Sequence, residues 1–415
     1  MKTVLLITLC LYSGFSQHLS LSESTDLNYK GSLEAQYWNF PLERQTFSIT
    51  DVTRFAGNLD LTLQGEFPFQ IRLNTRILID LESSTYNRYE LDDFYIDYFS
   101  DKYELRAGLQ IFSWKRVESV SQADFLNQTD LENDLLDADK FGELSARFRY
   151  IFETDIEQTI ELYYLPYFRT TTLPTGKNRY SFGQPISNEK EGFAYTATNK
   201  EWRPQFALRY QTTLFEDIDF SLFYFNGYNR FPGLLPHSSI LHHQYRTVDK
   251  SGFTFQGELS HWLVKGEFVY TRYHEDVQNQ RGEEIRPKYL AYTTGFEYTL
   301  YSPLVENQDM GFILELIGDT DTGTKAVELE GFRPFQNHIF TGLRYAFNTV
   351  TDRTLLLGFF IDYKNDNVIG KLEYEERIFN TFKLKLSYDY INTHSYPLST
   401  FTDNDRFKLN LGYYF

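Results

Sequence analysis

The sequence predicts an all-β fold: a transmembrane antiparallel β-barrel of about 18 strands, with about 16 as the alternative count, and without a plug domain. Three observations lead to this prediction. Apolar and polar side chains alternate along most of the chain, and a period of two places them on opposite faces of a strand. Aromatic residues make up 18% of the chain although its mean hydropathy is −0.45, as expected where only every second side chain meets lipid. The connections between candidate strands alternate between short and long.

The amino-terminus has the features of a secretory signal peptide. A basic start, a short apolar run and small residues precede the expected cleavage after Ser16. The run is shorter than the roughly 20 apolar residues that a membrane helix needs. Cys10 is the one cysteine of the chain, and its removal with residues 1–16 leaves no thiol for a disulfide or a metal. We predict a short periplasmic lead over residues 17–28 and the barrel over residues 29–415.

Four segments show the strand pattern most clearly: 29–38, 69–80, 143–150 and 382–390. In the first, Tyr29, Leu33 and Tyr37 share one face, while Lys30 and Glu34 share the other. An open sheet would leave unpaired backbone groups in hydrocarbon, so strands with a lipid-facing side have to close into a ring. A ring of about 18 strands encloses a lumen wide enough for water.

Links of two kinds separate the candidate strands. The short ones lie near residues 67–68, 100–102, 153–155, 215–217, 348–352 and 379–380. The long ones cover residues 39–50, 113–140, 169–203, 229–243, 275–286 and 320–334. Outer-membrane barrels turn their short connections to the periplasm and their long loops to the exterior. The same orientation is predicted here, with the first strand entering from the periplasm.

The closing strand ends in an aromatic residue. Phe407, Leu409, Leu411, Tyr413 and Phe415 fall on one face of this strand, and other residues alternate with them on the opposite face. The pattern resembles the last strand of outer-membrane proteins, which commonly ends in Phe and is read by the barrel-assembly machinery. The resemblance implies that these residues form a membrane-insertion signal. An ordinary amphipathic edge strand is the alternative.

The link at 113–140 carries the most distinctive motif. The segment Gly-Leu-Gln-Ile-Phe-Ser-Trp ends at Trp114, and Asp-Phe-Leu-Asn-Gln-Thr-Asp ends at Asp130. Here the sequence resembles a broad group of porin-like outer-membrane barrels that includes the alginate-export channels. Lys115 and Gln128 stand where Gly and Pro are common in that group. The resemblance implies a barrel of this kind and a loop that folds into the lumen, and it implies no substrate.

The composition of this loop predicts a pore constriction. The candidate residues are Trp114, Lys115, Arg116, Asp124, Asn127 and Asp130. Leucines between the carboxylates give the loop an apolar side to pack against the barrel wall, with one short helix starting near Asp130. Folded inward, the carboxylates would concentrate cations and repel anions. The alternative is an acidic surface loop, bridged to lipopolysaccharide through divalent ions.

Charged residues on the predicted inner faces of neighbouring strands are candidates for the pore wall. They are Arg72, Arg76, Asp93, Asp97, Arg106, Arg147 and Arg149. A basic wall opposite an acidic loop would set up a transverse electric field across the lumen. The alternative is a lattice of ion pairs that satisfies buried charges and stiffens the wall. The two interpretations do not exclude each other.

The sequence gives little indication of other chemistry. His237, His242 and His243 share one loop, but no carboxylate stands at a ligand spacing, so no metal site is predicted. Neither a Gly-x-Ser-x-Gly motif nor a glycine-rich phosphate loop occurs, so neither an enzyme nor a cofactor is predicted. The net charge of −17 argues against nucleic acid as a partner, because phosphate binding needs clustered Lys and Arg.

These observations predict a channel in the bacterial outer membrane, exported with a cleaved signal peptide. It would pass small polar solutes through a charged lumen by facilitated diffusion, surrounded by outer-membrane lipid and lipopolysaccharide. One alternative is a barrel that exports a polymer such as a polysaccharide. Another is a barrel that presents its loops for adhesion or as structure. The sequence gives no reason to choose an oligomeric state.

Overall fold

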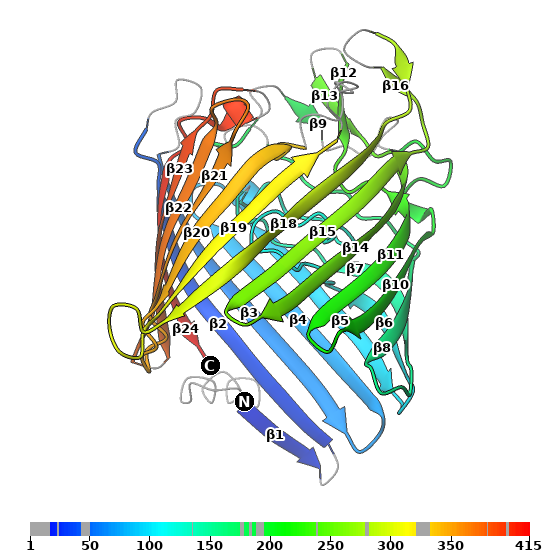
Figure 1. Cartoon of the computed structure of the whole chain (residues 1–415), viewed down its shortest axis with the longest axis vertical. Coiled ribbons are helices and arrows are strands. Elements are labelled where there is room, and N and C mark those ends of the chain that lie inside the picture. The colour runs from blue at the N-terminus through cyan, green and yellow to red at the C-terminus, as the bar shows by residue number, and fades with distance from the viewer. Residues whose placement is uncertain are drawn as a thin grey trace.

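The computed structural model describes residues 17–415, apart from residues 23–24, 43–49, 135, 175–177, 182–184, 188–194, 238–239, 279–281, 321–332, 380 and 396–397. The predicted signal peptide, residues 1–16, lies outside the described residues. The wall is a closed antiparallel barrel of 18 strands (Figure 1). This confirms the predicted fold class and the higher of the two strand counts.

The barrel strands follow one another around the ring in chain order. They are β2 (Thr25–Asn39), β3 (Asp51–Gly65), β4 (Phe69–Asp80), β5 (Arg88–Phe99), β6 (Tyr103–Gln110), β7 (Glu143–Ile151), β8 (Gln158–Leu165), β10 (Gln205–Leu214), β11 (Ile218–Tyr228), β14 (Thr247–Leu259), β15 (Trp262–Tyr273), β18 (Lys288–Tyr301), β19 (Asp309–Asp319), β20 (Asn337–Ala346), β21 (Thr354–Asp362), β22 (Val368–Ile378), β23 (Phe382–Asn392) and β24 (Arg406–Tyr414). The ring closes where β24 pairs with β2, from Ser32↔Tyr414 to Asn39↔Phe407. Closure gives every wall strand a partner on both sides, which a bilayer interior without water requires.

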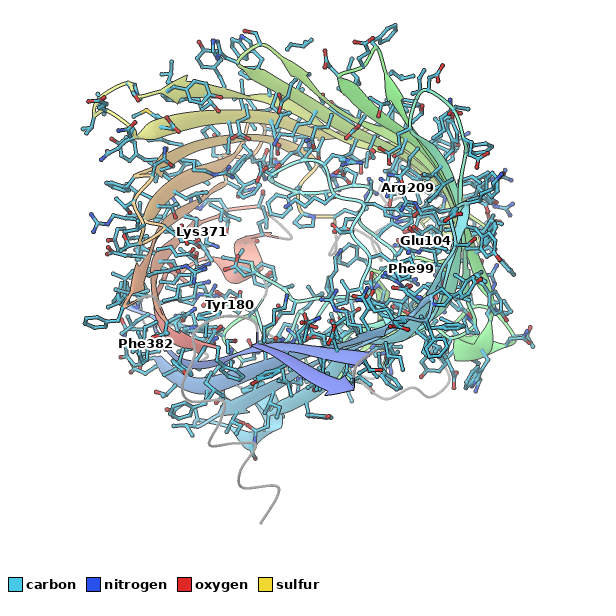
Figure 2. The ribbon with its side chains drawn as sticks, turned by 90° about the horizontal axis from the view of Figure 1, so that it is seen from below. Phe99, Glu104, Tyr180, Arg209, Lys371 and Phe382 are labelled. Atoms are coloured by element: carbon cyan, nitrogen blue, oxygen red, sulfur yellow. The ribbon has the colours of Figure 1, made fainter. Side chains whose placement is uncertain are left out.

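Side chains alternate across the wall as the sequence pattern predicts. On β24, Phe407 and Leu411 are exposed on the outside, whereas Arg406 and Lys408 are buried. Figure 2 shows the same division in neighbouring strands, with Phe382 of β23 at the outer margin and Lys371 of β22 inside the ring. Apolar outward and polar inward residues are the arrangement of a transmembrane barrel around an aqueous lumen.

The amino-terminal strands extend beyond the end of the closing strand. The last backbone hydrogen bonds between β2 and the chain end join Gly31 and Phe415, at 2.8 and 3.0 Å. Beyond them, β2 continues down to Thr25, and there β1 (Gln17–Ser22) becomes its partner. The strand therefore begins inside residues 17–28, which the sequence assigns to a lead, because β1 and β3 prolong it past the chain end.

The two ends of the barrel differ in their connections. Short turns join the strands at the lower end in Figure 1, and several contain a non-glycine residue in the left-handed region, among them Phe215 (φ 53°), Ser302 (φ 51°) and Phe379 (φ 52°). Longer segments join the strands at the upper end. Alternating short and long links were predicted from the sequence. In an up-and-down barrel, successive connections lie at opposite ends, so short turns at one end and long loops at the other give this alternation.

The longer segments contain a little regular structure of their own. The strands β9 (Ile186–Ser187), β12 (Gly233–His237) and β13 (Ile240–Gln244) form a small sheet, and β16 (Val277–Gln278) pairs with β17 (Glu284–Ile285). Short 3-10 helices are η1 (Ser84–Tyr86), η2 (Lys200–Trp202) and η4 (Leu398–Phe401). The three histidines predicted in a loop thus lie in the β12–β13 hairpin. In the described part of the chain, no helix has the length and apolarity to cross a membrane.

A β-bulge changes the pairing register between β4 and β5, and a glycine allows close contact between β5 and β6. The register between β4 and β5 shifts at Asn74, so that Asp92 and Asp93 are both buried where simple alternation predicts one inward residue. Gly108 on β6 has φ +138°, and a Cβ there would lie 2.1 Å from the carbonyl oxygen of Phe94. Only glycine permits this close approach of β6 to β5. The wall therefore carries an extra carboxylate beside the segment that follows β6.

Candidate functional site

The predicted pore-wall residues form ion pairs between adjacent strands. Arg106 of β6 binds Asp97 of β5 through two hydrogen bonds of 2.6 and 2.7 Å. Arg147 and Arg149 of β7 share Glu104 of β6, at 3.1 and 3.2 Å. Such pairs satisfy charges that the inner face of the wall would otherwise leave partly desolvated.

The ion pairs continue on β4. Arg72 binds Asp60 of β3 at 2.9 Å and lies 3.9 Å from Asp93. Arg76 binds Asp92 of β5 at 3.1 Å and forms a second ion pair with Asp139, which precedes β7. Within the described residues, every predicted wall arginine therefore has at least one carboxylate partner.

The β6–β7 segment, residues 111–142, is fastened at its base by one asparagine. Asn127 is buried, and its side chain binds the backbone of Gln110, Phe112 and Phe141 at 2.8 to 2.9 Å. A side-chain amide can donate and accept at once, so it can join two backbone segments that run side by side. The residue thus holds the beginning and the end of the segment together.

The first half of the segment packs against the nearby wall. Trp114 is buried, and its ring centroid lies 5.4 Å from that of Phe223 of β11 and 5.5 Å from that of Tyr163 of β8. Asp124 accepts the N–H of Trp114 at 3.1 Å and forms an ion pair with Lys140 at 2.5 Å. Aromatic contacts and a charge-assisted hydrogen bond therefore fix this part.

Two glutamates farther around the ring bind the backbone of the segment. Glu267 of β15 accepts hydrogen bonds from N–H groups of residues 116–123 at 2.7 to 3.4 Å. Glu315 of β19 accepts the N–H groups of Glu118 and Ser119, each at 2.8 Å. Neither glutamate was predicted from the sequence, because a single inward Glu on an alternating strand has no distinguishing motif.

A third set of contacts reaches β22 and β24. Asp137 binds Lys371 at 2.7 Å and Lys408 at 2.6 Å, and Asp134 binds Arg406 at 3.0 Å. Burial opposes ionisation of Asp137, but the charges of Lys408 and Lys371 outweigh it and hold the pKa of Asp137 below its ordinary value. The segment that leaves the wall at β6 is therefore tied to distant strands on both sides.

The short helix predicted near Asp130 is not found among the described residues of this stretch. Residues 131–133 form a turn instead. The acidic residues here have partners in different parts of the wall: Glu132 binds Arg88 of β5, whereas Asp134 binds Arg406 of β24. Burial raises the pKa of Asp130 and Glu132 above their ordinary values, although the charge of Arg88 opposes this shift.

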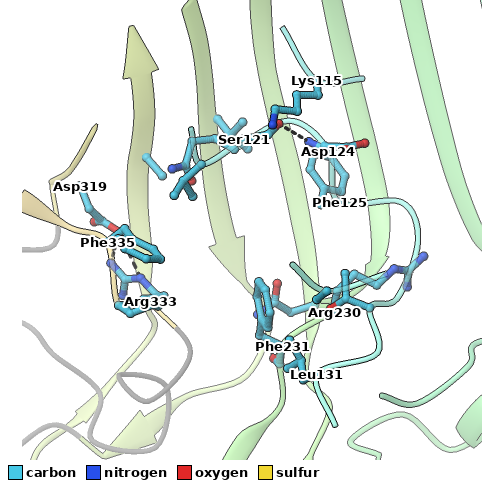
Figure 3. Close-up of a pocket in the computed structure, with 18 of the residues that line it drawn as sticks. Lys115, Ser121, Asp124, Phe125, Leu131, Arg230, Phe231, Asp319, Arg333 and Phe335 are labelled. Carbon is cyan, nitrogen blue, oxygen red and sulfur yellow. Dashed lines mark hydrogen bonds and ion pairs between the residues drawn. The ribbon is translucent and has the colours of Figure 1, made fainter. Parts of the chain in front are cut away.

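A cavity of about 430 Å³ lies beside the β6–β7 segment. Figure 3 shows Phe125 and Arg230 on one side of it, and Phe335 with the ion pair of Asp319 and Arg333 on the other. Its lining is mainly apolar, with a small number of charged groups. That composition is common in cavities that hold small organic molecules.

Two buried cations in this lining form no ion pair with any described residue. The ammonium of Lys250 on β14 lies 4.5 Å from the centroid of the Phe125 ring. The guanidinium of Arg230 donates to the carbonyl oxygen of Leu126 at 2.8 Å and to the side chain of Gln205 at 2.9 Å. The buried carboxylate of Glu143 also attracts Arg230, whereas a ring face compensates the buried charge of Lys250 only in part.

The predicted constriction residues divide into two groups. Lys115, Asp124 and Asn127 contribute to the lining of the cavity. Trp114 and Asp130 are buried between the segment and the wall instead. The backbone N–H of Arg116 binds Glu267, as described above. Among the residues with described positions, no group of three or more His, Cys, Asp or Glu is placed to hold a metal ion.

Comparisons with known proteins support the fold. No family model and no curated protein sequence matches the chain. Acinetobacter baumannii OccAB4 is similar in structure, with a TM-score of 0.52, 12% identity, and coverage of 95% of this chain and 98% of that one. A BenF-like porin from Pseudomonas fluorescens Pf-5 has a TM-score of 0.52 and 9% identity, covering 95% and 99%. Pseudomonas aeruginosa OpdK, solved with vanillate, has a TM-score of 0.51 and 9% identity, covering 95% and 98%. At such identities the likeness establishes the fold alone, a closed antiparallel barrel of 18 strands.

Proposed function

We propose that this protein is an outer-membrane channel that passes small polar solutes by facilitated diffusion. The observation that carries the proposal is the β6–β7 segment, which binds Glu267 and Glu315 on one side of the ring and Lys371 and Lys408 on another. A segment tied to both sides of an 18-stranded ring narrows its lumen, and narrowing a water-filled barrel is a common source of selectivity.

The charges around the cavity favour anionic solutes with an apolar part. The predicted wall arginines are neutralised by their carboxylate partners, which supports the lattice interpretation more than a strong transverse field. The carboxylates of the segment, such as Asp137, are also paired and would attract cations only weakly. Lys250 is the buried cation left to receive an anion, beside the ring of Phe125, whereas Arg230 has the buried carboxylate of Glu143 near it. Vanillate, with which OpdK was solved, is an aromatic carboxylate of this kind.

The two alternative functions, polymer export and adhesion, would require different properties of the β6–β7 segment. An exporter for a polymer such as a polysaccharide needs a lumen that a long chain can enter. A segment tied at several points favours small solutes instead. A barrel for adhesion needs no pore at all. Assembly by the barrel-assembly machinery and contact with lipid and lipopolysaccharide belong to any of these proposals.

Recording from purified protein in a planar lipid bilayer tests the proposal. We expect stepwise, steady conductance that increases when residues 116–123 are deleted, because the deletion removes the part of the segment that reaches the far wall. Absence of conductance in the protein and in the deletion variant would favour adhesion. A protein that conducts only after the deletion would favour polymer export.

Lys250→Gln tests the anion preference. Removing the charge should move the reversal potential toward cation selectivity and weaken block of the current by vanillate about tenfold, since a hydrogen bond to a charged group is worth about 1.5–3 kcal/mol. Lys383→Gln is the matched control, because Lys383 on β23 already has a carboxylate partner, Glu375, at 2.6 Å. Equal effects of the two substitutions would show that Lys250 has no special role.

A further inference from the structure

Glu267 and Glu315 are buried carboxylates without counter-ions. Each exposes 0% of its surface, and neither forms an ion pair with a described residue. Lys265, on the same strand as Glu267, binds Glu118 at 3.1 Å and Glu297 at 3.4 Å instead. A buried ionised carboxylate is strongly unfavourable unless other groups compensate its charge. These two residues therefore need an explanation beyond wall packing.

Backbone groups of the β6–β7 segment compensate the charge of Glu267. One carboxylate oxygen accepts the N–H of Arg116 at 2.7 Å. The other accepts the N–H groups of Gln122 and Ala123 at 2.7 and 2.9 Å and the hydroxyl of Ser121 at 2.7 Å. Backbone N–H groups that converge on one anion stabilise negative charge as a helix N-terminus does. The segment thus folds around a carboxylate that the wall supplies.

Glu315 is bound in the same way on β19. It accepts the N–H groups of Glu118 and Ser119, each at 2.8 Å, and also the Ser119 hydroxyl. Between the two glutamates, Thr293 of β18 donates to the carbonyl oxygen of Val120 at 2.7 Å. Three adjacent strands therefore hold one short stretch of the segment, mostly through its backbone rather than its side chains.

We propose that Glu267 and Glu315 are positioning residues that fix the β6–β7 segment across the lumen, so that the constriction is permanent and not a movable flap. The inference rests on the proposed function, since a constriction matters only in a conducting barrel. Without the carboxylates the N–H groups of the segment lose their acceptors.

Glu267→Gln, Glu315→Gln and the double substitution test this inference in planar bilayers. Glutamine has nearly the same shape as glutamate but carries no charge. Its side-chain NH2 group also cannot accept the hydrogen bonds that a carboxylate oxygen accepts from the backbone N–H groups. We expect folded barrels with higher and noisier conductance, because the detached state should gain population on the order of tenfold or more when charge-assisted hydrogen bonds are lost. The effect should be largest in the double variant.

Glu297→Gln is the matched control. Glu297 on β18 is also an inward carboxylate, but it binds the side chains of Lys265 and Arg344 and no backbone N–H of the segment. The substitution therefore changes the charge of the lumen by the same amount without removing an acceptor from residues 116–123. A current as noisy as that of the Glu267 variant would attribute the effect to charge alone and overturn the inference.

A spin label supplies a readout that does not depend on conductance. Cys10 is the one cysteine and belongs to the predicted signal peptide, so Lys115→Cys can carry a single label on the segment. We expect an immobilised spectrum in the otherwise unchanged protein and in the Glu297 variant, and a mobile component in the Glu267 and Glu315 variants. Immobile labels and steady currents in both glutamine variants would refute the inference.

The deletion of residues 116–123 separates the two proposals. If the deletion leaves conductance unchanged, the segment is no constriction and the proposed function is wrong in that respect. If the deletion increases conductance while both glutamine variants behave like the unchanged protein, the channel proposal stands and only the role of Glu267 and Glu315 is refuted.

Discussion

At the scale of single residues, buried arginines connect elements that are distant in the sequence. Arg406 on β24 is fully buried and binds Asp389 of β23 at 2.7 Å and Asp134 of the β6–β7 segment at 3.0 Å. Its guanidinium also lies 4.5 Å from the ring centroid of Trp38 on β2. One side chain therefore joins the closing strand, both of its neighbours and the segment inside the ring.

Arg406→Gln should destabilise the protein by about 3 kcal/mol, because it removes the hydrogen-bonding partner of two buried carboxylates and leaves them only Lys408, whose ammonium lies 3.5 Å from each. Urea unfolding in lipid vesicles, followed by tryptophan fluorescence, measures the change in the free energy of unfolding. Arg377→Gln is the control, since Arg377 binds Asp352 at 2.7 Å in an exposed position and should contribute little. Similar losses in the two variants would contradict this role for the buried pair.

Single residues were also where the sequence was least informative. Asn127 and Trp114 were predicted from a motif as residues of the constriction, but the motif did not indicate their contacts, which hold the segment to its base and to the nearby wall. Lys250 and Glu267 were not predicted, because each is one polar residue on the inner face of an ordinary strand. Their environments depend on what lies opposite them, and a strand pattern contains no information about that.

At the scale of elements, the closing strand completes the ring and also contains the predicted insertion signal. Its backbone completes the ring, and the backbone of Phe415 bonds to Gly31 in both directions. The aromatic side chain of Phe415 is not needed for these hydrogen bonds. The predicted insertion signal can therefore be separated experimentally from closure of the barrel.

Phe415→Ser should reduce the amount of assembled barrel in cells, because the assembly machinery would lose its terminal aromatic residue. Refolding from urea into lipid vesicles should remain close to that of the unchanged protein. Heat-modifiable migration on gels measures the folded fraction in both settings. Phe382→Ser, at an exposed aromatic position on β23, is the control. Equal losses in cells for the two variants would argue against a terminal signal.

The strands and the β6–β7 segment differ in how far the sequence predicts them. The predicted strands at 69–80 and 382–390 correspond to β4 and β23, because lipid on one side and water on the other impose a local alternation. The β6–β7 segment shows no regular alternation of apolar and polar residues, and the short helix predicted in it is not found among its described residues. Its shape follows instead from partners such as Arg88 and Glu267, which the ring brings close.

At the scale of the whole molecule, the barrel could be predicted from the amino-acid pattern. Alternation along the strands, with short and long links in turn, indicates a closed ring, since an open edge in hydrocarbon would leave backbone groups unpaired. What the ring encloses could be seen only in the folded structure: which charges neutralise each other, and which glutamates bind the backbone of the β6–β7 segment. The physical reason is that contact with lipid requires apolar side chains at alternate positions of a strand, a pattern that can be recognised in the local sequence. Contacts across the lumen instead join residues that are far apart in the chain.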